Sequence, residues 1–157
     1  MAGRLKDEIK KRGPFESLEQ EVLLNLLRTA DALGRDFEAV FKPAGISMTQ
    51  YNVLRILRGA GEDGLACGEI GDRMITRDPD MTRLLDRLES RGLITRVREA
   101  TDRRVVKTRI TKDGLSLLSK LDDPISATHQ KQMEHMDERK LQTLLKLLEE
   151  ARVKPVA

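Results

Sequence analysis

The chain of 157 residues is 39% hydrophobic and 35% charged, with a net charge of +3, and this length predicts one compact domain or one domain with a small appended subdomain. The absence of Trp and the scarcity of other rings argue against a protein that stacks successive single-stranded bases, and no apolar run approaches the roughly 18 residues of a membrane span. The charged N-terminus lacks the apolar stretch of a signal peptide and the single cysteine, Cys67, cannot form an internal disulfide, so we expect a cytoplasmic protein.

The first predicted element is a long helix over residues 16–41, ended by Pro43 and Gly45. Apolar side chains recur along it at steps of three and four residues, which is typical of a helix with one buried face. This stripe consists of Leu18, Val22, Leu26, Ala30, Leu33, Phe37 and Phe41.

Two further helices are expected before the middle of the chain. One begins near Thr49, with Ser47 or Thr49 as its N-cap, and the other is a short helix over residues 68–74. The glycine-rich segment 59–64 between them predicts a loop.

The next helix has the clearest signals at both ends. Asp78 suits an N-cap and Pro79 suits the first helical position, so we expect a helix over residues 79–91 that stops at Gly92. Apolar residues at i, i+3, i+4 and i+7 assign one face to the core. The outer face then carries Thr82, Arg83, Asp86, Arg87 and Ser90.

Two strands rich in β-branched residues follow, over residues 93–98 and 105–110, and the polar tip 99–104 joins them into a hairpin. The predicted elements follow the order of a winged helix-turn-helix: a helix, a short helix, a turn, a helix and a hairpin. In this fold the helix after the turn enters the DNA major groove. We therefore expect helix 79–91 in the major groove and the tip 99–104 in the minor groove, where arginine is attracted. The predicted fold class is mainly α with a small β-hairpin wing.

Helices also follow the hairpin. Thr111 is expected to cap a helix that Pro124 kinks or interrupts, and Asp137 to cap a last helix of about 15 residues. A helix of that length is marginal alone, so its apolar stripe packs either on a second copy of the chain or on the rest of this one. The stripe consists of Leu141, Leu144, Leu145 and Leu148.

Positive charge is concentrated in the predicted winged part. Residues 72–112 contain 12 Lys and Arg against 7 Asp and Glu, whereas the remainder contains 17 against 19. This block favours a polyanionic partner, although a solvated charged surface gives the same pattern. Arg83, Arg87 and Arg91 also repeat at four-residue steps, which costs an isolated helix a few tenths of a kcal/mol per pair. Either an anionic partner compensates this row, or nearby carboxylates do: Asp80, Asp86 and Glu89.

Four segments resemble the MarR family of bacterial transcription regulators: TQYNVLRILRGA (49–60), GEIGDRM (68–74), PDMTRLLDRLESRGLITR (79–96) and DRRVVKTRITKDG (102–114). The resemblance implies a homodimer that reads a near-palindromic double-stranded DNA operator, typically as a repressor. It also implies a small, often aromatic or phenolic, ligand bound between the domains that weakens DNA binding.

The resemblance also suggests a division of the chain and a set of contact residues. Helical dimerisation segments over 1–45 and 112–157 flank a DNA-binding domain over 46–111. The recognition-helix positions of the family correspond to Thr82, Arg83 and Arg87, and its Asp-x-Arg wing motif to Asp102 and Arg104. The full set of candidate DNA-binding residues is Arg77, Thr82, Arg83, Arg87, Asp102, Arg103 and Arg104.

Other functions have weaker support. No catalytic, cofactor or metal-ligand pattern is visible, and His129 and His135 lack a partner at metal-binding spacing, so we expect no enzyme, no cofactor and no metal. Cys67 is either a redox sensor or a small residue filling a turn, and the second interpretation is favoured. A protein-interaction module built on the same fold is expected to have an apolar outer helix face, and here that face is polar.

Overall fold

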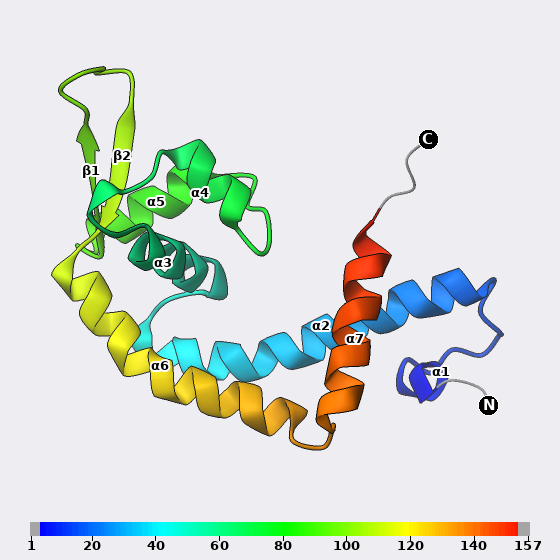
Figure 1. Ribbon diagram of the computed structural model, residues 1–157. Helices are drawn as coiled ribbons and strands as arrows, with labels where there is room; N and C mark the ends of the chain where they lie inside the picture. Colours follow the sequence, from blue (N-terminus) through cyan, green and yellow to red (C-terminus); the bar gives the residue numbers. More distant parts are fainter. Residues whose placement is uncertain (1–3, 154–157) are drawn as a thin grey trace.

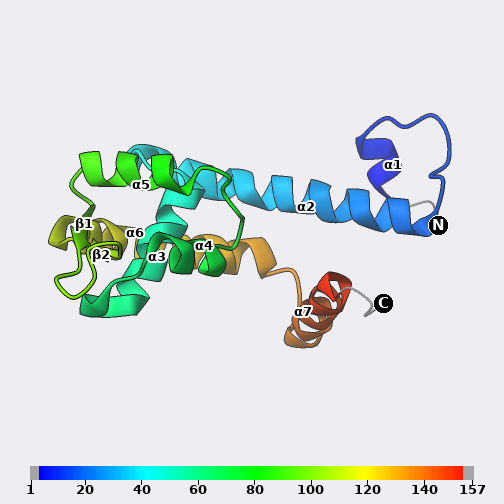
Figure 2. The same ribbon diagram turned by 90° about the horizontal axis from the view of Figure 1, so that it is seen from above.

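The structure is a computed structural model that describes residues 4–153. A winged helix-turn-helix domain forms one end, and the long helices α2 and α6 run away from it side by side (Figures 1 and 2). The mainly α fold with a hairpin wing is confirmed. In chain order the α-helices and strands are α1 (Arg4–Glu8), α2 (Leu18–Phe41), α3 (Met48–Ala60), α4 (Cys67–Arg73), α5 (Met81–Ser90), β1 (Ile94–Arg98), β2 (Val106–Ile110), α6 (Lys112–Met133) and α7 (Glu138–Arg152). Short 3-10 helices over Lys42–Ala44 and Gly61–Asp63 follow α2 and α3, so the segment predicted as a loop over 59–64 is largely helical.

The main core lies within the winged domain and is closed by the first half of α6. The apolar face predicted for α5 is confirmed: Leu84, Leu85 and Leu88 are buried and Met81 is half-buried. Because the inner face of α5 is anchored in this way, its outer face must be solvent-exposed. The core also contains Val53, Leu54, Leu57, Ile70, Met74, Ile94, Leu118, Leu121 and Ile125.

The wing is an antiparallel hairpin that projects beyond the helices (Figure 1). Its register pairs Ile94 with Ile110, and Leu65 adds a short bridge to Thr108 on the other side of β2. Gly64, at φ +65°, precedes this bridge, and a Cβ there would lie 2.6 Å from the Thr108 carbonyl oxygen. The close approach therefore requires glycine.

The N-caps of α5 and α3 differ in how they compare with the sequence predictions: the first corrects a prediction, and the second decides between two candidates. α5 begins at Met81 rather than at Pro79, because the Asp80 carboxylate accepts the Arg83 amide and Asp80 is the N-cap. Asp78 instead accepts the amide of Asp80 in a turn that precedes the helix. For α3 the cap is Ser47, not Thr49, and it forms a capping box with Gln50.

Helix α6 is continuous through Pro124, so the predicted interruption is wrong, although the helix bends along its length (Figure 1). Proline removes one backbone hydrogen bond, but Leu121 and Ile125 on either side of it are buried in the core and hold the chain helical. The caps expected for α6 and α7, Thr111 and Asp137, are both confirmed. The short helix α1, where Leu5 is buried, was not predicted.

The apolar stripe of α2 is only partly buried. Phe41 is in the core and Phe37 packs against it, whereas Leu18 is 72% exposed and Leu27, off the predicted stripe, is 60% exposed. Helix α7 overlaps α2 in Figure 1, but Figure 2 shows the two apart. Within residues 4–153 the N-terminal half of α2 thus presents an apolar surface. Over the same residues no helix combines the length and apolarity of a membrane span.

Candidate nucleic-acid interface

The outer face of α5 is polar and open to solvent, and Figure 2 shows the helix along one edge of the domain. Thr82, Arg83 and Arg87 are all exposed. Neither Arg83 nor Arg87 forms a salt bridge with any group in residues 4–153. Their guanidinium groups are therefore available to an external acceptor.

The neighbouring carboxylates have other partners, so local neutralisation does not explain the arginine row. Asp80 caps α5. Asp86 and Glu89 both bind the guanidinium of Arg96 on β1, at 2.5 Å and 2.6 Å from its Nη2. That hydrogen bond from Arg96 is the main reason why the pKa of Glu89 lies below its ordinary value.

Arg91 does not belong to the same surface as Arg83 and Arg87. Its guanidinium donates to the carbonyl oxygens of Gly45, at 2.6 Å, and Ala44, at 3.2 Å. It therefore ties the end of the recognition helix to the turn before α3. The four-residue repeat seen in the sequence thus combines two arginines that form no salt bridge within residues 4–153 with one arginine that has a structural role.

The wing tip presents its arginines in a fixed arrangement. The Asp102 carboxylate accepts the Arg104 backbone amide at 3.0 Å and its Nε at 3.2 Å, which lowers the pKa of Asp102. Arg98 donates to the Arg103 carbonyl oxygen at 3.1 Å across the hairpin. The side chains of Arg103 and Arg104 are exposed, and that of Arg104 is 91% accessible. Asp102 therefore orients Arg104 without covering it.

Arg77 lies in the turn between α4 and α5, exposed and without a salt bridge in residues 4–153. This turn is held by Asn52 of α3, whose Oδ1 accepts the backbone amide of Ile75 at 2.8 Å. Sequence reasoning missed Asn52, because its partner is 23 residues away and no local pattern marks the pair. Asn52 thus helps to set where α5 begins.

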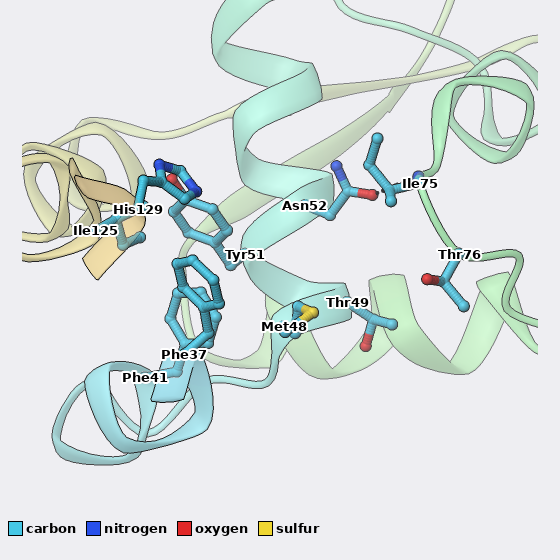
Figure 3. Close-up of a pocket in the computed structure, with 10 residues that line it drawn as sticks. All are labelled: Phe37, Phe41, Met48, Thr49, Tyr51, Asn52, Ile75, Thr76, Ile125 and His129. Carbon is cyan, nitrogen blue, oxygen red and sulfur yellow. Dashed lines mark hydrogen bonds between the residues drawn. The ribbon is translucent and has the colours of Figure 1, made fainter. Parts of the chain in front are cut away.

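A cavity of about 400 Å³ lies between the winged domain and the long helices (Figure 3). Phe37 and Phe41 of α2 form one wall, and Tyr51 of α3 packs on Phe41 with ring centroids 4.8 Å apart. The turn before α5 supplies the opposite side, so the cavity contacts the segment that positions the recognition helix. The lining residues are Phe37, Phe41, Met48, Thr49, Tyr51, Asn52, Ile75, Thr76, Ile125 and His129.

The cysteine and the histidines have ordinary surroundings. Cys67 is half-buried as the first residue of α4 and packs against the core. The ring of His129 lies 5.0 Å from that of Phe37, whereas His135 is exposed. In the described part of the chain, no three His, Cys, Asp or Glu side chains are grouped as metal ligands.

Comparisons with known proteins identify the family. Residues 46–106 match the model of the MarR family. The regulator TtmR of Methylorubrum extorquens is 33% identical over 107 residues, which are 68% of this chain but 54% of that protein. A MarR transcription factor from Planctomyces limnophilus is 41% identical, covering 86% of this chain and 98% of that one, with a TM-score of 0.67. A mutant MarR from E. coli, solved with operator DNA, has 22% identity and a TM-score of 0.74 over 96% of this chain and 100% of that one.

The fold, the two exposed arginines on the outer face of α5 and these matches define a transcriptional regulator of the winged helix-turn-helix type. The chain belongs to the MarR family.

Proposed function

We propose that the protein is a dimeric repressor that binds a near-palindromic DNA operator, with α5 in the major groove and the tip 99–104 in the minor groove. The observation that carries this proposal is that the guanidinium groups of Arg83 and Arg87, on the exposed face of α5, form no salt bridge within residues 4–153. A guanidinium donates bidentately to guanine or to a phosphate. In this proposal Thr82 on α5 and Arg77 in the turn before it complete the major-groove surface.

The wing supplies the second contact of the proposal. Arg103 and Arg104 extend from a narrow hairpin tip, and the bond to Asp102 reduces the freedom that Arg104 would lose on binding. A narrow minor groove concentrates negative potential, which attracts such side chains. With α5 and the wing on one domain, each chain would read one half-site.

The exposed apolar surface at the other end supports the dimer. Val22, Leu23 and Leu27 of α2 are 49%, 56% and 60% exposed, and Leu145 and Leu147 of α7 are 59% and 57% exposed. Burying such side chains is favourable by about 25 cal/mol per Å². We propose that the helical segments over 1–45 and 112–157 form this dimer interface around the DNA-binding domain over 46–111. Residues 1–3 and 154–157 of these segments lie outside the described structure.

A DNA titration tests this function. Fluorescence anisotropy with the region upstream of the protein's own gene should show tight binding at low salt and weaker binding as salt rises. Arg83→Ala should cost about 1–3 kcal/mol and reduce the preference for the operator over random DNA. Arg104→Ala should weaken binding and lower the salt slope. A wild-type protein with no affinity for duplex DNA at low salt would refute the proposal.

We further propose that the cavity of Figure 3 binds a small aromatic effector. Its walls are mostly apolar and contain no Lys or Arg, which favours an uncharged ring compound held by the polar groups of Tyr51 and Asn52. Phenols and the matching phenolic acids, compared by thermal shift and by release of bound DNA, test this proposal. Uncharged phenols should raise Tm and release DNA more effectively. A preference for the acids would contradict the assignment.

The remaining assignments follow from this function. A DNA-binding repressor acts where the chromosome is, so we propose a cytoplasmic location. The proposed activity is regulation by binding, and it needs neither catalysis nor a cofactor.

A further inference from the structure

We propose that Arg96 of β1 is a positioning residue for DNA binding: it holds the carboxylates of Asp86 and Glu89, and thereby keeps Arg83 free on the DNA-facing side of α5. This inference rests on the proposed function, because it concerns the same face of α5. Arg96 itself is not required to touch DNA, since only 23% of its side chain is exposed.

Arg96 makes four hydrogen bonds to the two carboxylates. Its Nη2 donates to Asp86 Oδ1 at 2.5 Å and to Glu89 Oε2 at 2.6 Å, and its Nε donates to Glu89 Oε2 at 3.0 Å. Its backbone amide donates to Glu89 Oε1, also at 3.0 Å. One residue of the wing strand therefore binds two successive turns of the recognition helix.

Helix geometry explains why these bonds matter for Arg83. Asp86 is three residues after Arg83, so the two side chains are neighbours on the helix surface and would attract each other. In the structure the Asp86 carboxylate instead bonds to Arg96, and Arg83 has no salt bridge within residues 4–153. Binding to Arg96 thus removes the competitor for the guanidinium that the proposed function assigns to DNA.

The same bonds reduce electrostatic repulsion of DNA. Asp86 and Glu89 place two negative charges on the helix that approaches the phosphates, and like charges across an interface weaken association. Arg96 offsets one of them and hydrogen-bonds both. Without Arg96, one more negative charge on α5 is left uncompensated, and its carboxylates are free to pair with Arg83 or to repel phosphate.

A double-mutant cycle tests this role. We expect Arg96→Gln to weaken operator binding roughly tenfold, similar to the loss of one specific contact. Adding Asp86→Asn should recover several-fold of that affinity, because the amide removes the negative charge that competes for Arg83. Arg96→Lys, which keeps the charge but not the planar fork, should lie between wild type and Arg96→Gln.

Two controls separate this role from a general loss of structure. Arg58→Gln also removes a guanidinium that binds a carboxylate, that of Asp122. Because Arg58 lies on α3 and not beside the outer face of α5, the operator affinity of this variant should equal that of the wild-type protein. Circular dichroism and urea unfolding identify any variant that is not folded. If Arg96 only stabilises the fold, Asp86→Asn will change operator affinity by the same factor in the wild-type protein and in Arg96→Gln.

Hydrogen exchange at Arg83, measured without DNA, separates the proposed role of Arg96 from the proposed DNA-binding function. In the free Arg96→Gln protein, the Nε–H of Arg83 should exchange with solvent more slowly than in wild type, because Asp86 now pairs with it. Unchanged exchange together with an absence of rescue would overturn the role of Arg96. If instead exchange slows but wild-type protein does not bind duplex DNA, the proposed function fails while the competition between Arg83 and Arg96 for Asp86 stands.

Discussion

The arginine side chains of the winged domain have different roles, and each role depends on the hydrogen-bond acceptor that the guanidinium contacts. Arg83 and Arg87 meet no carboxylate in residues 4–153 and face solvent. Arg91 meets two backbone carbonyl oxygens, and Arg96 meets two carboxylates. Arg104 is oriented by Asp102 but remains 91% exposed. The residue type alone therefore does not predict which guanidinium is available to DNA.

One residue-scale prediction concerns the ion pair between α3 and α6. Arg58 donates to both carboxylate oxygens of Asp122, at 2.9 Å each, and this holds the pKa of Asp122 below its ordinary value of 3.8. A carboxyl with a lowered pKa stabilises the fold above its unfolded pKa and loses that contribution as pH falls through the folded value. We therefore expect wild type to be more stable than Arg58→Gln at pH 7, with the difference shrinking below about pH 4.

Urea unfolding of both proteins between pH 7 and pH 3 measures this difference. Asp122 is partly exposed, so salt should reduce the difference at pH 7 as well. A difference that stays constant down to pH 3 would show that Arg58 acts through packing of its aliphatic part instead.

At the scale of elements, the junction between the wing and α6 depends on a helical glycine. A Cβ at Gly114 would lie 2.4 Å from the Leu93 carbonyl oxygen and 2.6 Å from Cγ1 of Ile110. Gly114→Ala should therefore destabilise the protein by about 1–3 kcal/mol, because the strands would have to move away from α6. The free energy of unfolding from urea titration is the measurement.

Gly59 is the matched control for this substitution. It is also helical, in α3, but a Cβ there would meet no atom within 4 Å. Gly59→Ala should stabilise the protein by about 0.5–1 kcal/mol, since alanine loses less backbone entropy in a helix. Equal effects of the two substitutions would mean that the close approach at Gly114 relaxes without cost.

The ends of the helices show which helix boundaries local sequence patterns can predict. Thr111 and Asp137 were recognisable as caps, and Ser47 was one of two candidates with Thr49, because Ser, Thr and Asp side chains can accept the backbone amide three residues ahead. The start of α5 was misplaced because Asp78 and Asp80 both suit a cap, and only the backbone path decides between them. Of the two effects predicted for Pro124, a kink or an interruption, the interruption is wrong for a related reason, since the burial of Leu121 and Ile125 outweighs the lost hydrogen bond.

At the scale of the whole molecule, we expect the apolar surface of α2 and α7 to set the oligomeric state. Leu27 is 60% exposed and lines the groove between these helices. We expect Leu27→Asp to shift the protein from dimer to monomer, because a dimer would bury the new carboxylate. Operator affinity should fall with it, since a monomer contacts one half-site. Sedimentation equilibrium measures the mass.

Ile75→Asp provides the comparison for that experiment. Ile75 is more exposed, at 89%, but lies in the turn before α5 rather than on α2 or α7. Its aspartate variant should keep the mass of the wild-type dimer. A monomeric wild-type protein, or a Leu27→Asp protein that remains dimeric, would place the dimer interface elsewhere.

The sequence by itself determined the elements from α2 onwards, their order and the buried face of α5, since periodicity, caps and β-branched runs act over a few neighbouring residues. Its resemblance to the MarR family indicated DNA binding. Tertiary structure decided which charges are free. The partners of Arg91 and Arg58 lie 46 and 64 residues away, and the walls of the cavity come from α2, α3, α6 and the turn before α5. The reason is physical: an ion pair or a cavity depends on distances in space, and those distances exist only after the core has packed.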